Sequence, residues 1–171
     1  TDADDVTRIR KRMHEIVKED LPFYRQEVQA DEATSVFARD GRSDVTKLIG
    51  TTRPVYVDYY TLAGSDHYYY DTLVPSSGYL DVWELERYRS GMLLRVPDRH
   101  HPEQLAPFFE QPKTFEVFAE NIHWNAIMKL DSVGDVNIAC QKGKASELIQ
   151  VAEALQEKKI VQIAEEIDRR F

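Results

Sequence analysis

The sequence predicts an α+β fold, with a central antiparallel sheet flanked by helices and a long helix at the C-terminal end. Three observations support this prediction. Apolar residues recur at helical spacing from Val6 to Val17, β-branched and aromatic runs dominate from Pro54 to Pro97, and a broad apolar stripe extends from Lys144 to Phe171. Helices therefore precede and follow the strands, as is typical of α+β proteins.

The N-terminal third is expected to contain two helical regions separated by a strand. Asp2 or Asp4 can cap a first helix that runs to about Asp20, because Leu21-Pro22 then interrupts the helical pattern. Three short elements follow, namely a strand over residues 23–30, a helix from Asp31 to about Asp40 with Gly41 as its stop, and a helical piece over Ser43–Ile49.

The middle of the chain reads as an antiparallel sheet with hairpin-length connections. Four runs carry this signal: "VYVDYYTLA", "HYYYDTL", "GYLDVWELERY" and "GMLLRVP". Gly64-Ser65, Pro75–Gly78 and Ser90-Gly91 separate them and are typical turn sequences.

After Pro97 the pattern becomes helical again. We expect helices over Glu103–Phe109 and Thr114–Leu130, a loop at "DSVGDVNIAC", and a long helix over Lys144–Phe171. The 171 residues suit one domain, in which residues 1–97 form helices plus the sheet and residues 98–171 form a helical extension.

Composition and charge exclude several classes of protein. The formal net charge of -8 disfavours a nucleic-acid binder, and the basic cluster Arg8, Arg10, Lys11 and Arg12 is interpreted as a solvated helix face. No run approaches the roughly 18 to 20 apolar residues of a membrane span. The first dozen residues are polar and unlike a secretory signal, and the lone Cys140 cannot form an internal disulfide. A cytoplasmic location is therefore expected.

Motifs that carry chemistry are missing from the sequence. It contains no G-x-x-x-x-G-K-[ST], no G-x-G-x-x-G and no G-x-S-x-G, and none of its five histidines pair at the i, i+4 spacing of a zinc helix. We therefore predict neither catalytic residues nor a metal site. His67 lies beside Asp66, which can raise the pKa of an imidazole, or the two can form a solvated turn.

Tyrosines are concentrated in the strand region. Seven of the nine lie between Tyr56 and Tyr79, including the run Tyr68 to Tyr70. Two interpretations remain open at this point. Exposed tyrosines can stack on a ligand or line a polar pocket, whereas buried ones pair across strands.

Two stretches carry a resemblance to a known family. "RMHEIVKEDLPFYRQEV" and "DEATSVFARDGRSDVTKLI" resemble the second additional domain of threonyl-tRNA synthetases, which edits mischarged tRNA. In that family a Cys-x-x-x-His half-site directly precedes a Val-Pro-Ser-Thr-Gly-like turn. Matching that turn to Val74–Gly78 puts Tyr69 at the cysteine and Leu73 at the histidine. Neither side chain binds a metal, and the family's His-x-x-x-His half would precede residue 1.

A closer resemblance is to the long uridine-kinase-like nucleoside kinases, which carry synthetase-like segments before their kinase core. The blocks "DTLVPSSGYL", "GMLLRVP", "EALQEKKI" and "IAEEI" are similar to "DTLVPSTGYL", "GFLLRFP", "EALHEKKI" and "IADEI" in that family. The resemblance implies that the chain is a segment of such a protein and that a P-loop follows Phe171. A parent kinase would use ATP and Mg²⁺, and the downstream kinase domain would be this segment's partner.

The resemblance implies a non-catalytic binding or regulatory module in a protein that phosphorylates a nucleoside with ATP. A small-molecule ligand is left open, and neither a membrane nor a nucleic acid is an expected partner. If a pocket exists, we expect its lining to include His67, Tyr69, Tyr70, Asp71, Thr72, Ser76 and Ser77. Two alternatives remain, a degenerate aminoacyl-tRNA-editing hydrolase that uses His67 and Asp71, and a purely structural or dimerisation module.

Overall fold

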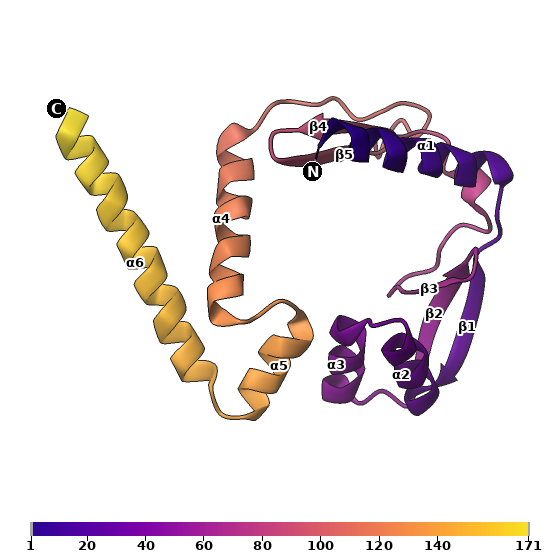
Figure 1. Ribbon diagram of the computed structural model, residues 1–171, viewed down its shortest axis with the longest axis horizontal. Coiled ribbons are helices and arrows are strands. Elements are labelled where there is room, and N and C mark those ends of the chain that lie inside the picture. Colours follow the sequence, from indigo (N-terminus) through magenta and orange to yellow (C-terminus); the bar gives the residue numbers. More distant parts are fainter. Residues whose placement is uncertain (1, 171) are drawn as a thin grey trace. The chain divides into compact units, whose positions relative to one another are not determined.

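The computed structural model describes residues 2–170, and within this range the chain forms an α+β fold, as predicted (Figure 1). Two compact units are present. The first extends up to Val28 and resumes from Val57 to Glu110, and the second comprises Gln29–Tyr56 and the residues from Gln111 onwards. The first unit thus continues beyond the expected boundary at residue 97, and residues 29–56 belong with the C-terminal helices. The assignment of residues 1–171 to one domain stays a prediction.

The first unit begins with helix α1, Ala3–Glu19, and the prediction for this helix is confirmed. Asp2 caps it, because its Oδ1 accepts a hydrogen bond from the Asp5 backbone N–H at 2.7 Å, while Asp5 Oδ2 accepts from the Asp2 N–H at 3.3 Å. Asp20 ends the helix in the left-handed conformation, with φ of 50°.

The strands form two small sheets where a single central sheet was expected. One sheet has the order β1-β2-β3, with β1 at Tyr24–Gln29, β2 at Tyr56–Leu62 and β3 at Ser65–Tyr68. The other is the hairpin of β4, Glu84–Tyr88, and β5, Gly91–Arg95. The antiparallel register places Tyr59 opposite Tyr68 and Glu84 opposite Arg95.

Two of the predicted strands are shorter than their sequence runs. β3 ends at Tyr68, so Tyr69–Leu73 lies outside the sheet, and Ser77–Tyr79 forms a 3-10 helix, η1. Both departures coincide with the docking of Pro75–Gly78 onto α1, which is described below. Beyond the hairpin, the predicted helix over Glu103–Phe109 is wrong, since this segment is irregular and Leu105 forms an isolated bridge with Pro97.

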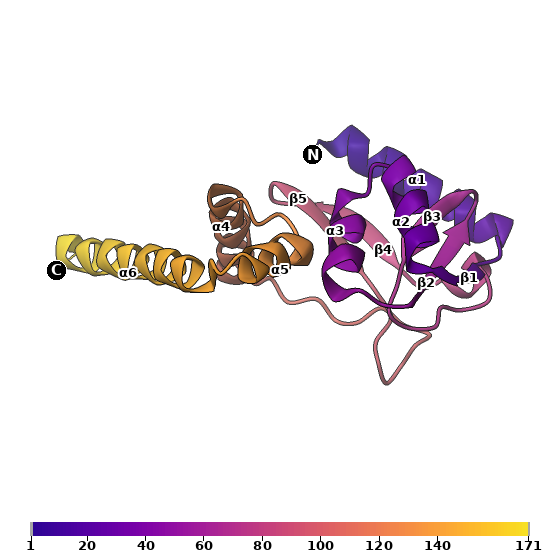
Figure 2. The same cartoon turned by 90° about the horizontal axis from the view of Figure 1, so that it is seen from below.

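Three helices form the compact part of the second unit. α2, Ala30–Arg39, packs against α3, Ser43–Thr52, and α3 also packs against α5, Val133–Gln141 (Figure 2). The short helices after β1 are thus confirmed, with Gly41 at a φ of 69° beyond the end of α2. Helix α5 falls where a loop was expected. Ser132 caps it, and Gly134 lets it approach α3, so the glycine that suggested a loop serves helix packing.

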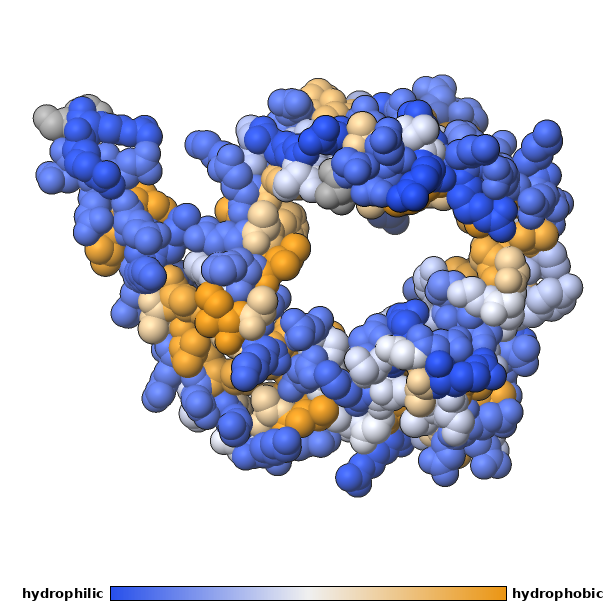
Figure 3. Space-filling model, viewed as in Figure 1, coloured by the Kyte–Doolittle hydropathy of each residue, from blue (hydrophilic) through white to orange (hydrophobic). Residues whose placement is uncertain are grey.

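The two remaining helices, α4 at Pro112–Met128 and α6 at Ala145–Arg170, confirm the predicted helices in these regions. Neither contains a buried residue. The pair is connected by an ion pair of 3.0 Å between Lys159 Nζ and Glu120 Oε2. Large apolar side chains on both helices remain exposed, and Figure 3 shows hydrophobic residues gathered over the first half of α6 and along α4.

Among residues 2–170, no helix combines the length and the apolar character that crossing a membrane requires.

Candidate functional site

The turn Val74–Gly78, which carries the family resemblance, docks onto the end of α1. The Phe23 N–H donates to the Pro75 carbonyl at 3.0 Å, and the Ser77 N–H donates to the Leu21 carbonyl at 2.8 Å. Pro22 and Ser76 form an isolated antiparallel bridge. The turn therefore pairs with the chain that leaves α1.

Ser77 is the centre of this contact, with a residue exposure of only 1%. Its Oγ donates to the Ile16 carbonyl at 2.6 Å and accepts from the Leu21 N–H at 2.8 Å. A carbonyl in the last turn of a helix has no partner within the helix, so Ser77 satisfies one such group. The hydroxyl thus donates one hydrogen bond and accepts another, and the residue is buried, so its role here is structural.

The carboxylate of Asp20 completes the junction. Its Oδ1 accepts from the Ser76 hydroxyl and from the Gly78 N–H, the latter at 2.9 Å. A Cβ on Gly78 would lie 2.7 Å from Asp20 Cγ, closer than non-bonded carbons approach. The backbone of Gly78 is not in the left-handed region, so any other residue here would be disfavoured only because the Asp20 carboxylate would have to move.

The tyrosine-rich segment is divided between the interior and the surface. Tyr59 and Tyr60 are buried, at 7% and 5% exposure, whereas Tyr69 and Tyr70 are 47% and 80% exposed. The Tyr60 hydroxyl accepts a hydrogen bond of 3.3 Å from the Leu73 N–H, and its ring contacts that of Tyr69 edge-on. The buried Tyr60 thus contacts both ends of a short segment, residues 69–73, that carries the exposed tyrosines.

Tyr68 is half-buried and lies between the buried and the exposed tyrosines in the sequence. Its ring lies edge-on to that of Tyr70, with 5.1 Å between the ring centroids. Burial raises the pKa of Tyr68, and the neighbouring Tyr70 contributes in the same direction. The Tyr68 phenol therefore stays neutral near pH 7 and can act as a hydrogen-bond donor.

The structure places the predicted site residues in two groups, with His67 at the end of β3. His67 pairs with Tyr60 across the sheet, and its ring lies 6.5 Å from that of Tyr69. Asp71 and Thr72 are exposed on the same segment as Tyr69 and Tyr70. Ser76 and Ser77 belong to the turn docked on α1, where their hydroxyls are bound to other groups.

Tyr69 and Leu73, which match the ligand positions of the synthetase half-site, carry no metal-binding group. The Tyr69 ring contacts the rings of Tyr60 and His67, and Leu73 is fixed through its backbone. In the part of the chain that is described, no three His, Cys, Asp or Glu side chains are grouped to hold a metal ion.

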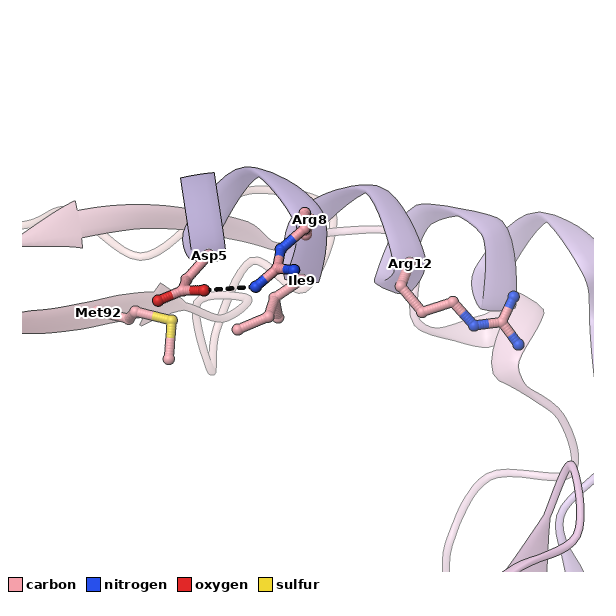
Figure 4. Close-up of a pocket in the computed structure, with 5 residues that line it drawn as sticks. All are labelled: Asp5, Arg8, Ile9, Arg12 and Met92. Atoms are coloured by element: carbon pink, nitrogen blue, oxygen red, sulfur yellow. Dashed lines mark hydrogen bonds and ion pairs between the residues drawn. The ribbon is translucent and has the colours of Figure 1, made fainter. Parts of the chain in front are cut away.

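Three surface hollows lie elsewhere in the first unit, along α1. One, of about 420 Å³, lies between α1 and β5 and is lined by Asp5, Arg8, Ile9, Arg12 and Met92 (Figure 4). Its charges are largely compensated. Arg8 binds Asp5 at 2.6 Å, which lowers the pKa of that carboxyl, and Arg12 lies 3.3 Å from Glu15 and 3.8 Å from Glu19.

Two further hollows adjoin another face of α1. One, of about 390 Å³, is lined by Thr7, Arg10, Lys11, His14, Glu15 and Lys18. The other, of about 430 Å³, is lined by Arg10, His14, Trp83, Glu84, Leu85 and Leu105. Our sequence reasoning selected none of these residues as a site. The available signal was the spacing of Thr7, Lys11, His14 and Lys18, which repeats on one helix face.

Comparison of the chain with protein families, with curated proteins and with solved structures finds no match.

Proposed function

We propose that this chain is a non-catalytic binding and regulatory module of a uridine-kinase-type protein. The proposal combines the sequence resemblance with one structural observation, the exposure of Tyr69 and Tyr70 at 47% and 80% beside a buried tyrosine pair. Rings that only paired across strands would be covered by their neighbours. Exposed rings on a short anchored segment are suited to stacking against a ligand or a partner.

The docked turn supports a non-catalytic role. A hydrolase that used a serine of this turn as its nucleophile would need a free hydroxyl, whereas the alternative that uses His67 and Asp71 is tested separately below. Here Ser77 binds Ile16 and Leu21, and Ser76 binds Asp20. The proposal includes a cytoplasmic location and a kinase domain downstream in the same protein, which would use ATP and Mg²⁺.

Kinase measurements on the full-length protein that contains this chain test the proposal. We expect ATP-dependent phosphorylation of uridine or another nucleoside. Tyr69→Ala combined with Tyr70→Ala should alter the dependence on nucleoside or ATP by several-fold while thermal unfolding stays unchanged. Tyr24→Ala is the matched control, because Tyr24 is also exposed, at 61%, and lies on β1.

Two outcomes would contradict the proposal. One is the lack of nucleoside kinase activity in the full-length protein. The other is hydrolysis of mischarged tRNA by the 171-residue chain above the buffer rate, because that result would favour an editing hydrolase. In that case His67→Ala or Asp71→Ala should abolish the hydrolysis.

A dimerisation module is a second candidate function, favoured by the exposed apolar side chains of α4 and α6. Phe118 and Ile122 on α4 are 65% and 70% exposed, and Ile160 and Ile167 on α6 are 57% and 55% exposed. Burial of these side chains against a second copy of the chain would form an interface, and a standard interface buries roughly 800 Å² on each partner.

Light scattering after size-exclusion chromatography tests this second candidate. A dimer that Ile160→Glu with Ile167→Glu converts to a folded monomer would support it. A monomer at about 100 μM would contradict it, since an interface of this size is normally stable at that concentration.

A further inference from the structure

Helix α1 carries two rows of cations, and among the described residues acidic side chains form ion pairs with the first row only. Arg8 and Arg12 form the first row, which faces Asp5, Glu15 and Glu19 in ion pairs of 2.6 to 3.8 Å. Lys11 and Lys18 lie in the second row, next to Arg10. Within residues 2–170, no acidic side chain forms an ion pair with Arg10, Lys11 or Lys18.

Arg10, Lys11 and Lys18 are not three or four residues apart, so they are not neighbours on the helix surface and none of them stabilises another. The fold therefore gains nothing from the second row, in a protein whose formal net charge is -8. Exposed lysine and arginine donors suit a phosphate group. Glu15 lines the same hollow, and its carboxylate is bound by Arg12 at 3.3 Å.

The neighbouring hollow adds a feature that a plain basic surface lacks. The exposed His14 ring lies against Trp83, with 4.4 Å between the centroids and an interplanar angle of 33°. Leu85 and Leu105 provide apolar lining, and the carboxylate of Glu84 is held by Arg95 at 2.7 Å. A planar ring can stack on an aromatic pair of this kind.

Arg10 and His14 line both hollows, so the cationic row and the aromatic pair adjoin. Both hollows, of about 390 and 430 Å³, are open to solvent, so a ligand bound there would remain partly exposed. We infer that this face of α1 and the adjoining Trp83 bind a nucleoside phosphate, with the phosphate on Arg10, Lys11 and Lys18 and the base against His14. The inference rests on the proposed binding role of the module, for which it supplies a ligand class.

Isothermal titration of the 171-residue chain with UMP and with ATP tests the inference. We expect saturable binding that weakens as NaCl is raised, because salt screens exposed charges. Uridine, which lacks the phosphate, and inorganic phosphate, which lacks the base, should each bind about tenfold more weakly. Equal binding of inorganic phosphate and the nucleotides would overturn the role of the aromatic pair.

Two double variants that remove the same charge distinguish a specific binding site from general electrostatic attraction. Lys11→Gln with Lys18→Gln should weaken nucleotide binding about tenfold, whereas Arg8→Gln with Arg12→Gln should change it by less than about twofold. Trp83→Leu should also weaken binding, with thermal unfolding as the check on folding. Equal effects of the two double variants, or no saturable binding of any probe that carries a phosphate and a base, would overturn the inference.

The same chemistry occurs in a free nucleotide and at the 5′ end of an RNA. If a short RNA with a 5′-phosphate binds and mononucleotides do not, the site is assigned to RNA ends. If the same RNA binds equally well without its 5′-phosphate, the inference of a phosphate site is overturned. Nucleotide binding with no nucleoside kinase activity in the full-length protein would leave this site standing while the proposed function fails. Kinase activity without nucleotide binding at α1 would leave the proposed function standing while this inference fails.

Discussion

The hydroxyl of Ser77 donates a hydrogen bond of 2.6 Å to the carbonyl of Ile16, 61 positions earlier in the chain. The same oxygen accepts from the Leu21 N–H at 2.8 Å, so one buried side chain joins the end of α1 to the turn that follows the tyrosine segment. The stretch that most resembles an editing domain is therefore a structural joint of the first unit.

Ser77→Ala tests the strength of this joint. The substitution leaves the Ile16 carbonyl and the Leu21 N–H without their partner in a buried place, which costs about 1–3 kcal/mol of unfolding free energy. Urea unfolding measures the loss. Ser90→Ala is the control, because Ser90 is exposed in the turn between β4 and β5, and it should change stability by less than about 0.5 kcal/mol. An equal effect of both variants would show that the joint contributes nothing.

Gly134→Ala is expected to weaken the packing of α5 on α3. The added Cβ would lie 2.5 Å from Lys47 Cβ and 2.9 Å from the Leu48 backbone nitrogen, so the helices must move apart at a cost of about 1–3 kcal/mol.

Gly50→Ala is the matched control within α3, since a Cβ at Gly50 meets no atom within 4 Å. Alanine there should stabilise the helix by up to about 1 kcal/mol. Thermal unfolding compares the two variants, and a Gly134→Ala protein as stable as Gly50→Ala would contradict the close approach.

Tyr60→Phe should loosen the segment that carries the exposed tyrosines. The variant removes the acceptor of the Leu73 N–H, a bond worth about 0.5–1.5 kcal/mol, while the buried ring stays in place. Hydrogen exchange of the Leu73 amide should become faster by several-fold. Tyr79→Phe provides the comparison, because Tyr79 is 67% exposed, and it should leave that exchange rate unchanged.

The ion pair of Lys47 and Asp135, at 2.7 Å, predicts a pH dependence of stability. Lys47 and then Ser132 lower the pKa of Asp135 below its ordinary 3.8, so the stabilisation is fully present above the unfolded-state pKa and is lost as pH falls through the folded-state pKa. Asp135 in turn raises the pKa of Lys47 above 10.5, so the contribution is also lost as pH rises through that folded-state value.

Denaturant unfolding of the wild type and of Asp135→Asn between pH 2 and pH 9 measures the acid limb. The difference in unfolding free energy should be constant from about pH 5 upwards and should shrink towards zero at acid pH. A difference that stays constant down to pH 2 would show that the charge of Asp135 has no role.

Local signals predicted most helices and the positions of the strand runs. The helix from Ala3 to Glu19, the turn at Gly41 and the long helix α6 follow from capping residues and apolar spacing, which act within one or two turns. The helix α5 was missed because its glycine reads as a loop signal. Gly134 allows α5 to pack closely against the backbone of α3, which is far away in sequence.

For the candidate site, the sequence by itself determined the residue types: the tyrosines, the serine-containing turn and the basic row of α1. Only the tertiary structure decided which of them are available. It buries Tyr60 and Ser77, exposes Tyr69 and Tyr70, and places Trp83 beside His14. The physical reason is that exposure and hydrogen-bond partners depend on contacts between distant segments, such as Ser77 with Ile16, and no local pattern encodes these contacts.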